Sequence, residues 1–194
     1  MQEQSVLPGI EAPTGPTDRL FLALFPDESA AAATAGIAQA LRVQHGLRGK
    51  PLQTGRFHVT LFHLGDYAGI QQDVLTAATR AAEGIKWPPF QLAFDRAESF
   101  SSSPRNRPLV LRGDQELSRL MDFQQTLGEA LKRAGLAKWV KPGYTPHMTL
   151  LYDDRVLAAQ AVEPVAWTAH ELVLVHSLLG QSRHLVAGRW PLTA

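Results

Sequence analysis

Two short segments of the sequence share one pattern, in which a histidine is followed by an apolar residue, a threonine and a leucine. The segments are Phe57-His58-Val59-Thr60-Leu61 and Pro146-His147-Met148-Thr149-Leu150. Their apolar and β-branched residues are typical of strands. Because side chains alternate faces along a strand, each histidine shares a face with the threonine two positions later. The pattern therefore predicts two half-buried strands, each presenting an imidazole and a hydroxyl on its polar face.

The segments around these strands predict an α+β fold. Strands are expected at 19–25, 57–64, 90–97, 109–112, 147–152, 171–178 and 184–190, and helices at 27–45, 71–83 and 114–134. The stretch between the strands at 147–152 and 171–178, which contains Pro and Trp, is interpreted as a connection. A helix precedes each copy of the repeated pattern, and adjacent strands favour antiparallel pairing. We therefore expect two related lobes, each of which contributes one motif strand to a shared cleft.

The length of 194 residues fits a single domain. Residues 1–17 are rich in Pro, Gly and polar side chains and lack the basic and apolar regions of a signal peptide. They are interpreted as a flexible leader before one bilobal domain at 18–194. No apolar run approaches the ~18 residues that cross a bilayer, so no membrane association is expected. A cytoplasmic monomer is the expectation.

The amino-acid composition excludes several kinds of chemistry. The sequence contains no cysteine, which excludes disulfides, thiolate nucleophiles and zinc–thiolate sites and fits a reducing compartment. The formal net charge is +1, so the chain lacks the overall basic field that drives non-specific nucleic-acid binding. Any nucleic-acid substrate must be recognised locally, by a few cationic and aromatic groups.

Two imidazoles and two hydroxyls facing each other across a cleft suit cleavage of a phosphodiester without a metal. A neutral histidine can take a proton from water, and a protonated one can give a proton to the departing oxygen. The ordinary histidine pKa of ~6.5 makes both forms accessible near neutrality. Threonine hydroxyls can donate to the non-bridging phosphate oxygens. We therefore predict His58 and His147 as catalytic residues, and Thr60 and Thr149 as phosphate-binding residues.

The paired motifs resemble those of the 2H phosphoesterase superfamily, and more closely its LigT-like branch of RNA 2′,3′-cyclic phosphodiesterases, also called 2′-5′ RNA ligases. The resemblance rests on residues 56–62 with Leu64-Gly65, and on residues 144–150. It implies a fold of two pseudo-symmetric lobes of antiparallel sheet, backed by helices, around a central cleft. It also implies opening of a 2′,3′-cyclic phosphate to a 2′-phosphomonoester with no cofactor, and the reverse 2′-5′ ligation. It also implies that His58 donates the proton and His147 accepts it. Where family members often carry a tyrosine near the end of the chain, this sequence has His184.

Four further residues are candidates for substrate binding: Arg56, Tyr144, Arg105 and Arg107. The two arginines in the polar loop could contact RNA phosphates while Phe100 stacks on a base, although a solvated hairpin tip is the default interpretation. His63 is expected on the opposite strand face from His58. His176 is interpreted as a satisfied core or cleft-lining residue. Trp139 is interpreted as a core residue.

Two alternatives remain at this stage. The same two-histidine chemistry could act on another small cyclic or 2′-5′ phosphoester, since the modest charge does not require a long RNA. The protein could also be a non-catalytic module that binds RNA or nucleotides. No metal is expected, because the motifs do not supply the ligands of zinc and no acidic cluster indicates magnesium.

Overall fold

The computed structural model describes residues 15–100, 105–113 and 117–194. The strands are β1 (Asp18–Leu24), β2 (Val59–Tyr67), β3 (Phe90–Ser99), β4 (Arg107–Arg112), β5 (Met148–Asp153), β6 (Gln160–Ala169), β7 (Glu171–Leu178) and β8 (Arg183–Pro191). The helices are α1 (Glu28–Gln44), α2 (Gln72–Glu83) and α3 (Ser118–Arg133), and the short 3₁₀ turns are η1 (Thr54–Arg56) and η2 (Ala137–Trp139). The α+β prediction is confirmed. Residues 1–14 of the predicted leader and 114–116 of the third predicted helix lie outside the described residues.

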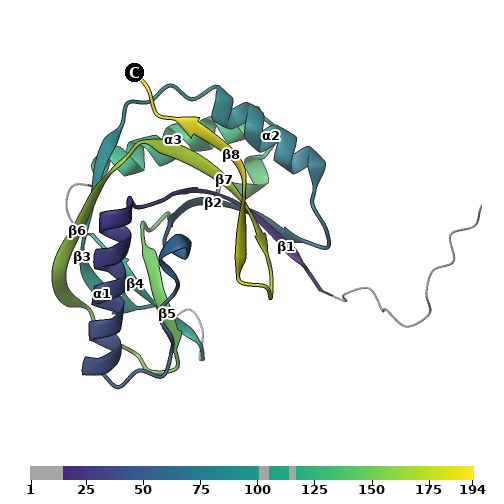
Figure 1. The fold of residues 1–194 in the computed structure, drawn as a ribbon. Coiled ribbons are helices and arrows are strands. Elements are labelled where there is room, and N and C mark those ends of the chain that lie inside the picture. Colours follow the sequence, from purple (N-terminus) through teal and green to yellow (C-terminus); the bar gives the residue numbers. More distant parts are fainter. Residues whose placement is uncertain (1–14, 101–104, 114–116) are drawn as a thin grey trace, which may run out of the picture.

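The eight strands form one antiparallel sheet in the order β6-β3-β4-β5-β2-β1-β7-β8. The sheet consists of two four-stranded halves that meet where β2 and β5 pair at Val59 and Met148. We refer to β2-β1-β7-β8 as the His58 half and to β6-β3-β4-β5 as the His147 half, because each includes the strand that follows that histidine. The predicted lobes are thus continuous through a single join (Figure 1).

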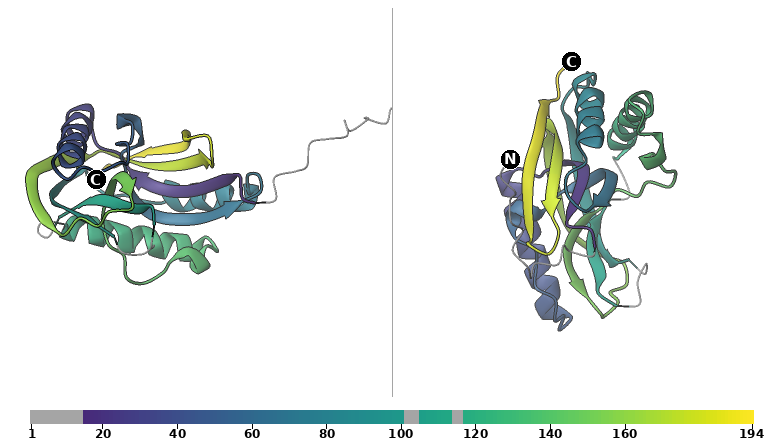
Figure 2. Two further views of the ribbon diagram at one scale, coloured as in Figure 1. Left: turned by 90° about the horizontal axis from the view of Figure 1, so that it is seen from below. Right: turned by 90° about the vertical axis from the view of Figure 1, so that its right-hand side faces the viewer.

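Helices cover the sheet on the side away from the cavity described below. Helix α1 packs on β5 and β6, whereas α2 and α3 pack on each other and contact β7, β8 and β3 (Figures 1 and 2). Helix α1 begins as predicted, with the Asp27 carboxylate accepting a hydrogen bond from the Ala30 amide at 2.8 Å. That bond satisfies one of the unpaired amides at a helix start. Although α1 lies before β2 in the sequence, it covers the other half of the sheet.

Strand β6 was not predicted, because Pro164 lies in the segment that was interpreted as a connection. The structure places β6 at an edge of the sheet, where a residue without a backbone N–H is tolerated. The pairing of β3 with β6 also shifts register between Phe94 and Arg96, opposite the stretch from Val165 to Ala161. The proline therefore sits in an irregular part of an edge strand, where it breaks no regular ladder.

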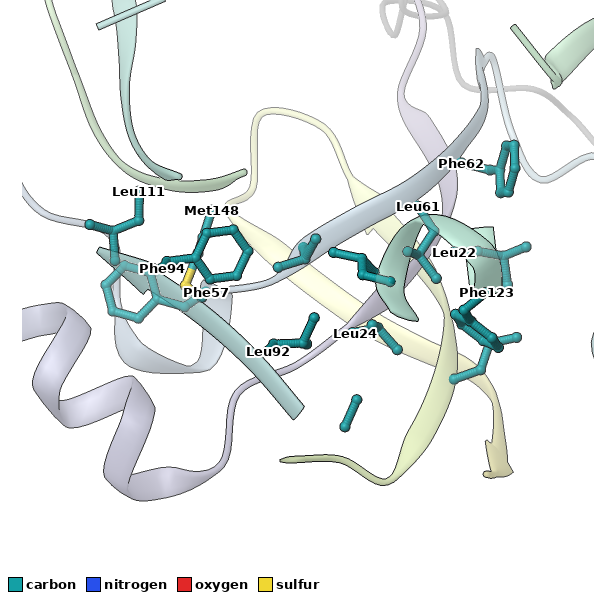
Figure 3. Packing of buried hydrophobic residues seen from close by; sticks show 14 of the residues in the cluster. Leu22, Leu24, Phe57, Leu61, Phe62, Leu92, Phe94, Leu111, Phe123 and Met148 are labelled. Carbon is teal, nitrogen blue, oxygen red and sulfur yellow. The ribbon is translucent and has the colours of Figure 1, made fainter. Parts of the chain in front are cut away.

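The hydrophobic core joins the two halves. Leu22, Leu24 and Leu61 of one half belong to the same buried cluster as Leu92 and Phe94 of the other (Figure 3). Alternate residues of β1 point away from this cluster: Phe21 and Ala23 pack with Val173 and Val175 in a smaller second cluster. This second face of β1 supports the site.

Candidate active site

A cavity of about 450 Å³ lies where the two halves meet, and both copies of the repeated motif contribute to it. His58, Thr60, His147 and Thr149 all line this cavity, as the strand alternation predicted. The other principal polar residues of its lining come from the His58 half and the adjoining turn: Arg19, Arg56, His63, Ser177, Ser182 and His184. The described lining contains no carboxylate, so the cavity favours an anion.

The join between the halves brings the two motifs together. Val59 pairs with Met148 across β2 and β5, and each catalytic candidate is the residue immediately before its strand begins. The histidines therefore lie at the two strand entrances and not inside the strands as predicted. Because the strands are antiparallel, one histidine approaches the join from each side.

The two imidazoles are held in the same way. Nδ1 of His58 bonds to the carbonyl oxygen of Arg56 at 2.7 Å, and Nδ1 of His147 bonds to the carbonyl oxygen of Thr145 at 2.8 Å. A carbonyl oxygen can only accept, so each Nδ1 carries the hydrogen. Nε2 is then the nitrogen of each ring that remains available for proton transfer. The repeated motif thus includes a hydrogen bond to the carbonyl two residues earlier.

Both motif strands contain a bulge three positions after the histidine. Ala23 pairs with Thr60 but Leu22 pairs with Phe62, so Leu61 is the extra residue in β2. Val110 pairs with Thr149 but Leu109 pairs with Leu151, so Leu150 is the extra residue in β5. A bulge of this kind reverses the facing of the residues that follow it, in β2 as far as a second register shift at Leu64.

The bulges overturn the prediction for His63. It lies on the cavity side with His58 and Thr60 and lines the cavity, and Tyr152 holds the equivalent place after Thr149. His63 bonds through Nε2 to Asp66 at 2.7 Å, and the same carboxylate binds Arg19 at 2.6 and 2.7 Å. Arg19 and His63 of this group line the cavity, and Asp66 lies outside its lining. Strict alternation along β2 could not have placed His63 there.

Aromatic rings pack against both histidines. Phe21 stacks on His58 with ring centroids 4.8 Å apart, and Phe100 meets the ring of His147 edge-on at 4.9 Å. Phe100, for which stacking on a base was considered, packs against the His147 ring in this structure. His184 approaches His58 edge-on at 5.4 Å and accepts a hydrogen bond at Nε2 from the Arg56 guanidinium at 3.4 Å.

Burial lowers the pKa of His58 to about 4, with further contributions from His184 and His147 when these are protonated and from the positive charge of Arg56. Burial also lowers the pKa of His147, helped by the charge of Arg112. The pKa of His184 falls to about 4 for the same reason, with Arg56 and Arg19 as the nearby charges. Without an anion beside them, all three imidazoles are therefore neutral at neutral pH.

Cross-strand pairing places His184 at the cavity. Arg19 pairs with Ser177, and Ser177 pairs with His184, so the three side chains follow one another across β1, β7 and β8. The sequence comparison marked His184 as a departure from the family but assigned it no place. Arg19 and Ser177 belong to segments that supported the family resemblance, but neither was predicted as a site residue.

The remaining candidates fall in different places. Arg56 lines the cavity, and Tyr144 lines a second pocket that adjoins it. Arg107 bonds to the backbone carbonyl of Asp154 at 2.6 Å and lines neither pocket, and exposed Arg105 lines neither. His176 is partly buried beside Asp18, to which its Nε2 is hydrogen-bonded, so its side chain is satisfied as predicted. The two loop arginines are thus not brought to the cavity.

Two further features bear on the kind of protein. In the part of the chain that the structure describes, no three His, Asp or Glu side chains are grouped in a way that could hold a metal ion. Among the same residues, no helix is long and apolar enough to cross a membrane.

The sequence model of the 2′-5′ RNA ligase superfamily matches residues 25–181, which include both motifs. The chain belongs to this superfamily, which is the LigT-like group of two-histidine phosphoesterases. A search of curated proteins finds no match.

Solved structures share the fold. E. coli LigT in its apo form is 24% identical, with a TM-score of 0.68 over 93% of this chain and 100% of its own. A structure described as a phosphoesterase is 22% identical, with a TM-score of 0.68 over 92% and 100% of the two chains. The protein TT0787 of Thermus thermophilus is 21% identical, with a TM-score of 0.67 over 90% and 97%. These similarities establish the LigT-like architecture.

Proposed function

We propose that the protein opens 2′,3′-cyclic phosphates at RNA ends to 2′-phosphomonoesters, using His58 and His147 as a general acid–base pair and no metal. The observation that carries this proposal is the duplicated placement of the two rings. Each imidazole is fixed through Nδ1 by a backbone carbonyl, with a threonine beside it in one carboxylate-free cavity. Matched proton carriers on two sides of one anion site are what an in-line displacement at phosphorus requires.

In the proposed reaction, a water oxygen bonds to phosphorus as the bond between phosphorus and the ribose 3′-oxygen breaks. His147 takes the proton of the water at Nε2, and His58 gives the proton at its Nε2 to the departing 3′-oxygen. This direction follows the family resemblance. Thr60 and Thr149, which line the cavity beside the histidines, donate to the non-bridging oxygens as negative charge gathers on them. Proton exchange with solvent returns both rings to their starting forms.

The low pKa of His58 couples catalysis to substrate binding. A phosphate anion placed near the ring favours its charged form and raises its pKa, whereas burial without an anion favours the neutral form. The donor would therefore gain its proton when the substrate enters. Arg56 lines the same cavity as His58 and adds positive charge there. We propose it as the cation that contacts the phosphate.

RNA as the substrate class is supported by the superfamily to which the chain belongs. LigT, which shares the fold, has been crystallised with 3′-AMP and with phosphate, so that protein holds a nucleotide and a phosphate ion. The same step with an RNA 5′-hydroxyl in place of water, again with cleavage of the bond from phosphorus to the 3′-oxygen, would give a 2′-5′ phosphodiester.

The test is hydrolysis of adenosine 2′,3′-cyclic phosphate and of an oligoribonucleotide with a cyclic phosphate end, in EDTA, with 2′- and 3′-phosphate products resolved. We expect a 2′-phosphate that is lost in His58→Ala and His147→Ala. His170→Ala is the matched control, because His170 is exposed between β6 and β7, outside the cavity. Loss of activity in EDTA would refute the metal-free mechanism. Tight oligonucleotide binding without turnover would support the binding module instead.

A further inference from the structure

His184, on the edge strand β8, lines the catalytic cavity but has no part in the proposed proton transfers. Its ring centroid lies 5.4 Å from that of His58 and 5.4 Å from that of Phe21, in edge-on contact with both rings. Its Nε2 also lies 3.4 Å from the Arg56 guanidinium. Family members often carry a tyrosine where this sequence has His184. A role for this histidine therefore has to come from its own contacts.

The hydrogen bond between Arg56 and His184 has a defined direction. A guanidinium only donates, so Nε2 of His184 accepts and Nδ1 carries the hydrogen. The imidazole must be neutral to accept. Burial lowers the pKa of His184 to about 4, with the charges of Arg56 and Arg19 contributing, so the ring is neutral near pH 7. Among the described residues, His184 is the hydrogen-bond partner of the Arg56 side chain.

Arg56 links the two histidines of the His58 half. Its backbone carbonyl accepts the hydrogen bond from Nδ1 of His58, and its side chain donates to His184. Arg56 is the last residue of η1, which lies in the connection between α1 and β2. A long cationic side chain in such a connection loses rotamer freedom when it binds a ligand. A contact that already orders the guanidinium lowers this cost and so strengthens binding.

Two donors of this pair have no acceptor. Nε of Arg56 and Nδ1 of His184 are both buried, and the described part of the protein offers neither of them a hydrogen-bond partner. A buried donor without an acceptor lowers stability, so these donors do not serve the packing of the protein. Both side chains line the cavity, and the oxygens of a phosphate there can accept from them.

We propose that His184 is a positioning residue for the phosphate, which acts by accepting the Arg56 hydrogen bond and holding the guanidinium at the cavity. The inference rests on the proposed function for Arg56 as a phosphate contact. His184 exchanges no proton with the substrate in this role. Loss of the acceptor should therefore raise KM, because the phosphate is bound less tightly, and leave kcat nearly unchanged, because His58 and His147 still transfer the protons.

Two substitutions separate the acceptor of His184 from its ring. His184→Gln keeps a neutral side chain that can accept and removes the ring, whereas His184→Phe keeps a ring beside His58 and Phe21 and removes the acceptor. In His184→Phe we expect the KM for adenosine 2′,3′-cyclic phosphate to rise about five- to tenfold, as for loss of a charge-assisted contact. In His184→Gln it should rise by no more than about twofold.

Leu185→Ala is the matched control, because Leu185 is the next residue of β8, is exposed and lines neither pocket. It should leave KM and kcat unchanged. A wild-type KM in His184→Phe together with a raised KM in His184→Gln would show that His184 acts by packing, and would overturn the proposal. A fall in kcat in His184→Phe with no change in KM would also overturn it.

A double substitution tests whether His184 acts through Arg56. If it does, adding His184→Phe to Arg56→Ala should change KM by no more than about twofold, because the contact is already lost. Residues that act independently would give multiplicative effects, and that result would overturn the proposal.

A binding measurement separates this role from the proposed reaction. Titration calorimetry on the full-length protein gives the Kd values of adenosine 2′-monophosphate and adenosine, and their ratio reports the phosphate contact without turnover. We expect His184→Phe to lower the preference for the monophosphate about five- to tenfold and to leave adenosine binding unchanged.

The two proposals then fail in different ways. A protein that shows this loss of preference but turns over no cyclic phosphate keeps the role of His184 and loses the proposed reaction. A protein that hydrolyses the cyclic phosphate, with a KM and a binding preference that His184→Phe does not alter, keeps the reaction and loses the role of His184.

Discussion

The His58 half and the His147 half of the sheet contain the same local arrangement of residues in different surroundings. Each supplies a histidine at a strand entrance, a bond from Nδ1 to the carbonyl two residues earlier, a threonine on the cavity face, and a bulge at the next residue. Around His58 lie Phe21, Arg56 and His184. Around His147 lie Phe100 and the second pocket, with the charge of Arg112 nearby. The shared geometry fits a shared chemistry of proton transfer.

The two halves differ in the groups that surround these shared features. The cavity that both motifs line has Arg19 of β1 and Arg56 of η1 near His58. A second pocket lies beside His147, between β2 and the segment before β5, where Tyr144 and Lys141 line it.

Removing either histidine should have the largest effect. We expect His58→Ala and His147→Ala each to lower kcat by about 10²–10⁴-fold, the usual contribution of a general acid or base. Because the two rings act in one step, the double variant should be little worse than the worse single variant. Steady-state kinetics on adenosine 2′,3′-cyclic phosphate measures this. Strictly multiplicative losses would show that the halves work independently.

Removing a threonine hydroxyl should cost less. Thr60→Val and Thr149→Val keep the shape of the side chain and remove a donor to the phosphate oxygens, and we expect about 10²-fold lower kcat in each. Thr60→Ser and Thr149→Ser, which retain the hydroxyl, are the matched controls and should keep most of the activity. A large loss in only one half would break the functional equivalence of the two motifs.

The pH dependence should differ between the free and the occupied site. Burial holds the pKa of His58 at about 4 and lowers that of His147, so the proton donor is mostly unprotonated in the free protein near neutrality. The kcat/KM optimum should therefore lie on the acid side of the ordinary histidine pKa of ~6.5. A bound phosphate anion raises these pKa values, so the kcat optimum should lie about one pH unit or more higher. Coincident profiles for the two parameters would contradict this coupling.

Two arginines provide the smallest and sharpest contrast. Arg56 lines the cavity, and we expect Arg56→Ala to lower kcat/KM by about tenfold, as for loss of a charge-assisted contact. Arg107 is bonded to the Asp154 carbonyl and lines neither pocket, so Arg107→Ala should change kcat/KM by no more than about twofold. Measured at one fixed salt concentration, a larger loss for Arg107 would show that the loop at the tip of the β3–β4 hairpin reaches the substrate.

Local pattern determined much of this protein. The start of α1 at Asp27, the strands around both motifs and the shared face of each histidine and threonine follow from periodicity, capping and strand alternation. These features depend on neighbours a few residues away, so the sequence alone carries them. The duplication of the motif also indicated a shared cleft, since one copy cannot surround a phosphate.

Tertiary structure decided the rest, because it depends on residues far apart in the chain. The bulges at Leu61 and Leu150 appear only in the pairing with β1 and β4, and they turn His63 and Tyr152 toward the cavity. Pro164 is tolerated because β6 is an edge strand, a position that sheet order alone defines. Cross-strand register brings His184 beside His58 and leaves Arg107 elsewhere. A sequence specifies which side chains are present, but pairing between distant strands sets which of them meet.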